Sequence, residues 1–237
     1  MKCLTWNLEW VTAASRRLKV IQAMIADVSA DVVCYTEVAQ DALPNRFAIT
    51  SDPDYGYPIK SQRRKVMLWS RLPWTDVDAV GEASMPSGRF VSGVTAGVRF
   101  VGICIPWAYA HVSTGRKDRK AWEDHLAYCH ALGHVLERYS RLAEPVCVLG
   151  DFNQRIPRRS QPKRAYAALR DAIPDTFVIT TEGLIDGEGK PLIDHIAVSP
   201  GLKPELVEIV PRFSPEGTRL SDHVGISATL KRIADTG

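Results

Sequence analysis

Residues 146–153 read Val-Cys-Val-Leu-Gly-Asp-Phe-Asn, an apolar run that ends in glycine and is followed by two oxygen-bearing side chains. A continuous apolar run of this length is typical of a strand that is buried on both faces of its sheet. Asp151 and Asn153 therefore come where a hydrophobic core gives way to solvent. Taken alone, Asp-x-Asn is also typical of a turn, so its meaning depends on the rest of the chain.

Strand-like and helix-like segments alternate on both sides of this run. Residues 2–8 and 31–35 predict buried strands, and residues 15–28 between them carry apolar side chains at helical spacing. Further strands are predicted at 65–70, 74–80, 89–97, 99–105, 145–149, 192–198, 205–210 and 223–230, and further helices at about 117–139 and 163–172. The closely spaced strands between residues 65 and 105 predict antiparallel hairpins. Residues 38–62, which contain several prolines and a glycine, predict an irregular connection. Groups of strands separated by helices predict an α+β fold of two mixed sheets packed face to face with helices outside.

Composition narrows the class of protein. The 237 residues contain 45% apolar side chains and no linker or low-complexity tract, which predicts one domain over residues 1–237. Five cysteines without a CxxC pair do not support a zinc site or a disulfide framework, and predict buried free thiols in a reducing compartment. The sequence shows neither a signal peptide nor an apolar run long enough for a membrane span. We therefore expect a cytoplasmic protein.

Polar side chains stand at the ends of several other predicted strands. They are Asn7 in Thr-Trp-Asn, Glu37 in Thr-Glu-Val, Asp194 in Ile-Asp-His-Ile, and Asp222 with His223 in Ser-Asp-His-Val-Gly. A single carboxylate after a strand is usually a turn or cap residue. Five such signals, each rich in oxygen ligands, indicate a common cleft.

The chemistry of these residues is mutually consistent with hydrolysis of a phosphate ester. Mg²⁺ (or Mn²⁺) prefers carboxylate and amide oxygens, which Glu37, Asp222 and the nearby Asn7 offer. A phosphate ester also needs its charge neutralised and a water aimed in line with the leaving group.

The remaining four residues fit the catalytic roles. Asp151 can orient and deprotonate the attacking water, and the neutral Asn153 can donate a hydrogen bond to a phosphoryl oxygen. Protonated His223 can stabilise the developing charge, while a carboxylate at Asp194 holds its ring and favours its protonated form. His195 lies beside Asp194 in a strand, is expected to face the other way and is left outside this set.

These five strings, in this order and over nearly the whole chain, resemble the motif set of the endonuclease/exonuclease/phosphatase superfamily. Its members include abasic-site endonucleases, tyrosyl-DNA phosphodiesterases, nucleases of the DNase I type, inositol polyphosphate phosphatases and neutral sphingomyelinases. The resemblance implies a four-layered αββα sandwich and a divalent-metal-dependent phosphoesterase. Arg89, which follows Gly88, resembles an arginine often found before a central strand in this superfamily and is expected to bind substrate.

One segment departs from the pattern of the superfamily. Many relatives carry Asn or His after the proline that follows the strand ending near residue 105, whereas Pro106 is followed here by Trp107. Tyr109 or His111 can replace that phosphate contact, and Trp107 can stack on a base. A partly buried loop tryptophan is the alternative interpretation.

Basic residues favour a nucleic acid as the substrate. They gather at Arg63–Lys65, at Arg116–Lys120 and around Arg155, Arg158 and Arg159, in segments predicted to be loops or helix starts. Asn153-x-Arg155 is similar to a sequence in tyrosyl-DNA phosphodiesterases. The leading hypothesis is a nuclease or phosphodiesterase acting on DNA or RNA. The alternatives are an enzyme acting on phosphoinositides, sphingolipids or small phosphorylated metabolites, and a binding module without catalysis, which the intact acidic set argues against.

Overall fold

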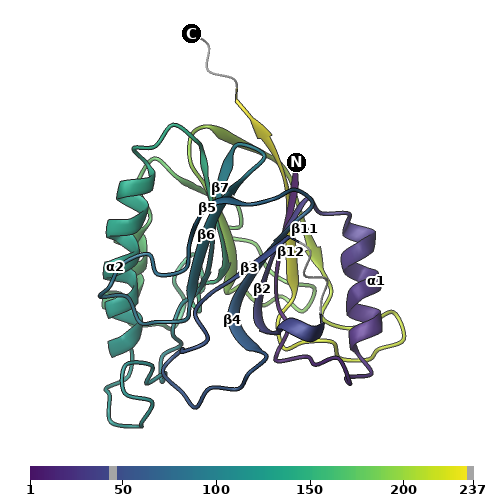
Figure 1. Ribbon diagram of the computed structural model, residues 1–237, viewed down its shortest axis with the longest axis horizontal. Helices are drawn as coiled ribbons and strands as arrows, with labels where there is room; N and C mark the ends of the chain where they lie inside the picture. Colours follow the sequence, from purple (N-terminus) through teal and green to yellow (C-terminus); the bar gives the residue numbers. More distant parts are fainter. Residues whose placement is uncertain (43–46, 234–237) are drawn as a thin grey trace.

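Two mixed β-sheets packed face to face form the centre of the molecule, with helices on both outer faces (Figure 1). The computed structural model describes residues 1–42 and 47–233. Helix α1 (Leu18–Val28) covers one sheet, and helices α2 (Glu123–Tyr139) and α3 (Lys163–Ala172) cover the other. The predicted α+β class and αββα layering are therefore confirmed. Among the described helices, each is too short or too polar to span a lipid bilayer.

The first sheet has the strand order β11-β12-β1-β2-β4-β3. Its strands are β1 (Lys2–Asn7), β2 (Val32–Ala39), β3 (Ala48–Thr50), β4 (Arg63–Ser70), β11 (Leu202–Val210) and β12 (Gly225–Arg232). Strands β1 and β2 are parallel and are joined through α1, while the other neighbours are antiparallel.

The second sheet has the strand order β5-β6-β7-β8-β10-β9. Its strands are β5 (Thr75–Asp78), β6 (Phe90–Thr95), β7 (Val98–Cys104), β8 (Val146–Asp151), β9 (Val178–Ile179) and β10 (Asp194–Val198). Its parallel pair is β7 and β8, joined through α2, and the remaining pairs are antiparallel. The two sheets thus each contain one strand–helix–strand unit.

Three hydrophobic clusters hold the four layers together. The inner faces of the two sheets meet in one cluster that includes Val66, Phe100 and Ile226. A second lies between the first sheet and α1, and a third between the second sheet and helices α2 and α3. The strands of the centre are apolar on both faces because each face is covered. All five cysteines are free and buried, as predicted.

Both long helices begin later than the sequence predicts. Helix α1 begins at Leu18 rather than residue 15, since the Arg17 guanidinium donates to the backbone oxygens of Leu8, Glu9 and Leu220 and holds the preceding turn against the loop after β1. Helix α2 begins at Glu123 rather than residue 117. Trp122 has a left-handed backbone, and its N–H donates to a carbonyl of the preceding loop, so the chain cannot continue the helix backwards.

Several strand predictions also need correction. Arg63, Arg64 and Lys65 are not in a loop but open β4, where they alternate between the two faces of the strand. The hairpin series from residue 65 onward is interrupted, because β4 belongs to the first sheet and β5 to the second. The connection predicted at 38–62, part of which lies outside the described residues, contains the 3-10 helix η1 (Gln40–Ala42) and the edge strand β3.

Glu37 lies within β2 rather than at its end. The pairing of β2 with β4 passes from Thr36–Val66 to Val38–Arg64, and Glu37 between them has a left-handed backbone with φ of 49°. Non-glycine residues with positive φ are uncommon and concentrate at functional sites. The strand therefore continues past Glu37, but its backbone turns at this residue.

Topology brings the chemically interesting strand ends together. Parallel neighbours end at the same edge of a sheet, which places Asn7 at the end of β1 beside Thr36 of β2. In the second sheet the end of β8 pairs with the start of β10, so that Asp151 lies opposite Asp194. These two edges belong to sheets that pack face to face.

Gly150, directly before Asp151, provides a test of how tightly β8 must pack against β7. It has φ of +143°, and a Cβ built on it would lie 2.0 Å from the backbone oxygen of Ile103. We expect Gly150→Ala to lower the free energy of unfolding by about 2 kcal/mol or more, because neither the backbone conformation nor the neighbouring strand accepts a methyl group. Urea denaturation measures this loss.

The matched control is Gly187→Ala, since a Cβ at Gly187 would meet nothing within 4 Å. That variant should unfold within about 0.5 kcal/mol of the wild type. Equal stability of the two variants would contradict the close approach of β7 and β8 at Gly150.

Candidate active site

A hydrogen bond between the two sheets lies at the centre of the site. The Asn7 amide nitrogen of β1 donates to Oδ2 of Asp151 at the end of β8, over 3.3 Å. Both side chains are about 2% exposed. The Asn7 Oδ1 accepts from the N–H of Glu9 at 2.9 Å, which fixes the orientation of the amide. The ends of β1 and β8, 144 residues apart in the sequence, are therefore in direct contact.

Asp151 is held by amide groups. Its Oδ1 accepts from the backbone N–H of Asn153 at 2.9 Å, and its Oδ2 accepts from the side-chain amide of Asn153 at 3.1 Å. Burial and the nearby Asp194 carboxylate raise the pKa of Asp151, His223 acts in the opposite direction, and the resulting pKa is about 7. A carboxyl group with this pKa is poised to accept and release a proton near neutral pH.

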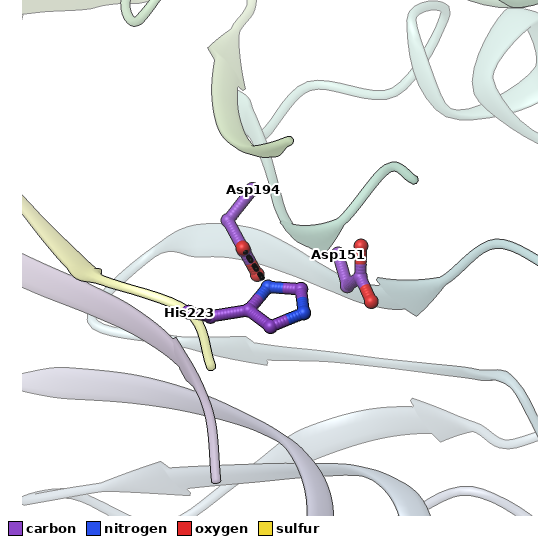
Figure 2. A group of neighbouring side chains, drawn as sticks. All are labelled: Asp151, Asp194 and His223. Carbon is purple, nitrogen blue, oxygen red and sulfur yellow. Dashed lines mark hydrogen bonds and ion pairs between the residues drawn. The ribbon is translucent and has the colours of Figure 1, made fainter. Parts of the chain in front are cut away.

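Asp194 and His223 form a buried ion pair. Nδ1 of His223 lies 2.5 Å from Oδ2 of Asp194, the first residue of β10, and the other edge of the imidazole faces Asp151 (Figure 2). Burial alone lowers the pKa of His223, but the charge of Asp194 and the hydrogen bond to it outweigh burial and raise the pKa to about 10. The imidazole is therefore a cation at neutral pH, between two carboxyl groups.

The turn before β12 is anchored to the end of β1. The Ser221 hydroxyl donates to the backbone oxygen of Asn7 at 2.6 Å, and the Trp6 indole donates to the backbone oxygen of His223 at 3.0 Å. Asp222 lies between these anchors with its side chain 52% exposed. Asn7 is thus flanked by the segment that carries Asp222 and by the β2 residue that precedes Glu37.

Glu37, Asp222 and Asn7 supply hard oxygen donors of the kind that Mg²⁺ and Mn²⁺ bind. Oε1 of Glu37 accepts from the Lys65 ammonium at 2.6 Å, and the Glu37 side chain is 24% exposed. The donor set fits a hydrated divalent ion that keeps several waters. Lys65 was not predicted as a site residue, because its partnership with Glu37 crosses from β4 to β2 and leaves no pattern in the sequence.

A second group of potential ligands is Asp151, Asp194 and His223, whose ligand atoms lie within 4.8 Å of one another. His223 carries a proton at neutral pH because its pKa is raised to about 10. A metal bound by this imidazole would have to displace that proton, since ligation needs the lone pair that the proton occupies. The site thus offers this group for proton transfer, and Glu37, Asp222 and Asn7 as oxygen donors for a divalent ion.

The segment after β7 lies beside the group of Asp151, Asp194 and His223. The Asn153 amide, besides contacting Asp151, donates to the backbone oxygen of Ile105 at 2.8 Å, two residues before Trp107. Trp107 and Tyr109 are 53% and 61% exposed, with their rings edge to face at 5.2 Å between centroids. His111 is engaged within its own loop, where its Nδ1 accepts from the N–H of Arg119 at 3.1 Å.

The predicted arginines fall into two groups. Arg155, Arg158 and Arg159 lie on the exposed loop after Asn153, and within the described residues none of them is within ion-pair distance of a carboxylate. Arg89 is instead only 2% exposed, with its guanidinium donating weakly to the backbone oxygen of Cys104 at 3.3 Å. Its Nε is buried and has no hydrogen-bond partner in the described structure.

Sequence comparison places the chain in one family. The sequence profile of the endonuclease/exonuclease/phosphatase family matches residues 4–223. Among curated proteins, no sequence matches the chain.

Solved structures of low identity share the fold. A 3′-5′ exonuclease from Neisseria meningitidis has a TM-score of 0.70 and 22% identity, covering 98% of this chain and 100% of that chain. An AP endonuclease from Archaeoglobus fulgidus has a TM-score of 0.72 and 17% identity, covering 98% and 99%. A mannosyl-6-phosphatase from Bacteroides thetaiotaomicron has a TM-score of 0.64 and 15% identity, also covering 98% and 99%. At these identities the likeness establishes the fold alone.

The ion pair can be tested without a substrate. Asp194→Asn removes the charge that holds the proton on His223, so the pKa of His223 should fall from about 10 to about 7 or below, where burial disfavours the charged ring. NMR titration of the imidazole measures this change. In the wild type the pair stabilises the fold fully below about pH 6.5, and that contribution is lost as the pH rises through about 10.

Asp222→Asn is the control. Oδ1 of Asp222 lies 3.9 Å from Nε2 of His223, and its charge raises the pKa of His223 less than the charge of Asp194 does. A His223 pKa that stays near 10 in Asp194→Asn would show that another group holds the proton.

Proposed function

The chain belongs to the endonuclease/exonuclease/phosphatase family, and on that premise we propose that it is a divalent-metal-dependent nuclease or phosphodiesterase that hydrolyses DNA or RNA. The members of this family are hydrolases of phosphoester bonds. The observation that carries the proposal is the buried group of Asp151, Asp194 and His223, in which a carboxyl group with a pKa near 7 adjoins a protonated imidazole.

Asp151 acts as the general base in this proposal. Its carboxyl oxygens accept hydrogen bonds from Asn153 and Asn7, which fix its direction, and its pKa of about 7 lets it take a proton from water near neutral pH. The water so oriented attacks phosphorus in line with the leaving oxygen.

His223 and Asn153 bind the phosphoryl group. The imidazolium ring, kept charged by Asp194, offers a positive donor to the oxygen on which negative charge develops. Asn153 is neutral, so its amide adds no repulsion, and it would donate to a non-bridging oxygen by exchanging its hydrogen bond to Oδ2 of Asp151 for one to the substrate. The imidazolium is fixed by Asp194 before the substrate arrives, which avoids the cost of reorganising it during reaction.

Glu37, Asp222 and Asn7 would hold the divalent ion. Family members typically use such ions, and a bound one neutralises charge on the phosphoryl oxygens. The backbone of β2 turns at Glu37, and Ser221 ties the loop that carries Asp222 to the end of β1.

Charge and aromatic surface favour a nucleic acid over a small phosphate ester. Arg155, Arg158 and Arg159 form a basic loop directly after Asn153, without carboxylate neighbours in the described structure. Trp107 and Tyr109 present exposed rings on the adjacent segment. Arginines that follow a backbone together with rings that stack on bases are typical of nucleic-acid clefts.

Asp151→Asn in an Mg²⁺/Mn²⁺ activity panel is the direct test. The panel covers single- and double-stranded DNA and RNA, 5′-adducts, abasic sites and phosphoinositides. We expect metal-dependent cleavage of a nucleic acid, and a decrease in turnover of about 10²–10⁴-fold in Asp151→Asn, because the base is lost while the shape is kept.

Asp175→Asn, the same chemical change at an exposed position after α3, should leave turnover unchanged. Full activity of Asp151→Asn would remove the assigned base. Cleavage of phosphoinositides alone would favour a phosphatase, the class of activity named for the Bacteroides neighbour. Absence of any metal-dependent hydrolysis would favour a binding module.

Salt dependence tests the basic loop. Binding of a catalytically inactive variant to single-stranded DNA should weaken as salt is added. A plot of the logarithm of the binding constant against the logarithm of the salt concentration should have a slope of about −0.7 for each phosphate neutralised. Arg158→Glu with Arg159→Glu should weaken binding and reduce the slope by about 1 to 2. Fluorescence anisotropy at several salt concentrations gives both quantities.

Lys203→Glu with Lys231→Glu is the control of equal charge. These two exposed lysines pair across β11 and β12 at the strand ends away from the site. Equal weakening by both double variants would show an effect of net charge rather than of the loop.

A further inference from the structure

Two histidines outside the catalytic set are completely buried. His125 of α2 and His195 of β10 are both 0% exposed, and each uses both ring nitrogens in hydrogen bonds. Burial of an imidazole without pairing all its polar atoms is costly, so such full pairing indicates a specific arrangement. Both rings converge on Gln154, the residue directly after Asn153.

His125 connects the catalytic turn to the segment after β7. Its Nδ1 lies 2.7 Å from the backbone oxygen of Pro106, and because a carbonyl only accepts, this nitrogen carries the proton. Its Nε2 is then an acceptor and receives the side-chain amide of Gln154 at 2.6 Å. The second hydrogen of that amide points to the backbone oxygen of Ala165 at 2.7 Å. The two carbonyls thus fix both the tautomer of His125 and the orientation of Gln154.

His195 contacts the same turn from the opposite side. Its Nε2 donates to the backbone oxygen of Gln154 at 2.9 Å, and its Nδ1 accepts from the Thr181 hydroxyl at 2.7 Å. Its ring packs edge to face against Phe152 at 5.3 Å. His195 follows Asp194 in β10, and since neighbouring strand residues face opposite ways, the two serve different faces of one strand.

From this geometry we propose that His125 and His195, acting through Gln154, are positioning residues that clamp the Asp151–Arg155 turn against the Ile105–Trp107 segment. The inference rests on the proposed function, because the turn carries the proposed base, Asp151, and the proposed phosphate donor, Asn153. Neither histidine touches the substrate. Their effect is to fix where the base and the donor stand relative to each other and to the exposed ring of Trp107.

Several features require such a clamp. Asn153 has a left-handed backbone with φ of 52°, which costs free energy and needs surrounding contacts to persist. Beyond Asp151, the last residue of β8, the turn leaves the β-ladder. Burial lowers the pKa of both His125 and His195 to about 4, so both rings are neutral and keep the donor–acceptor roles that the clamp uses. A misplacement of about 1 Å at the base is enough to slow a reaction by about 10²-fold.

Substitutions at His125 separate the two contacts. His125→Phe keeps the ring volume and removes both hydrogen bonds. His125→Gln can still accept from Gln154 near the position of Nε2, whereas His125→Asn can only restore the donor to Pro106 near the position of Nδ1. His134→Phe, on the exposed face of the same helix, is the matched control.

The first measurement needs no substrate. Hydrogen exchange of the full-length protein should be at least about tenfold faster at the amides of residues 151–155 in His125→Phe, with the amides of β1 and β2 unchanged. His125→Gln should restore slow exchange more completely than His125→Asn. Unchanged exchange in His125→Phe, faster exchange throughout the protein, or better recovery by His125→Asn would each overturn the proposal.

The second measurement uses the nucleic acid that the activity panel identifies. We expect kcat to fall about 10–100-fold in His125→Phe with KM within about threefold, because the base is misplaced while the phosphate contacts remain. His125→Gln should recover kcat and His134→Phe should match the wild type. A rise in KM at constant kcat would overturn the positioning role. If the wild type hydrolyses nothing, the proposed function fails, and the exchange experiment still decides whether the clamp exists.

Discussion

The contact between the Asn7 amide and the Asp151 carboxyl group is the constraint on which the site depends. It joins the ends of β1 and β8 where the two sheets meet, at a point that is almost closed to solvent. Burying a carboxyl group there is unfavourable unless donors surround it. Asn7 and Asn153 supply these donors, and the same burial raises the pKa of Asp151 to about 7. The packing of the sandwich therefore produces the proton affinity that the chemistry needs.

The second buried carboxyl group has the opposite consequence. Asp194 lies opposite Asp151 in the β8–β10 pairing, and two close carboxylates cannot both carry charge cheaply. His223 resolves this conflict as a cation between them, with its pKa raised to about 10 by Asp194. The charge of Asp194 is thus balanced by its ion pair with His223, whereas Asp151 keeps a pKa of about 7. Different surroundings give two chemically identical side chains different roles.

A layered arrangement supports the catalytic turn from behind. His125 comes from α2 and His195 from β10, so the outer helix layer and the sheet both contact Gln154. The basic loop after Asn153 and the rings of Trp107 and Tyr109 are exposed. The two supporting histidines are therefore buried and neutral, whereas the loop that follows the turn is exposed and positive. The proposed action on a nucleic acid requires such a basic surface next to fixed catalytic groups.

The sequence by itself determined the layers and predicted the candidate site residues. Apolar runs and helical spacing were enough to predict two sheets packed face to face with helices outside, and polar strand ends singled out Asn7, Glu37, Asp151, Asn153, Asp194, Asp222 and His223, because these signals are local in the chain. Only the tertiary structure decided that β4 and β5 belong to different sheets, that Lys65 faces Glu37, and that Arg89 is buried. It alone also showed His125 and His195 meeting at Gln154. Such contacts join residues far apart in the chain through packing, and packing between distant segments leaves no periodic trace in the sequence.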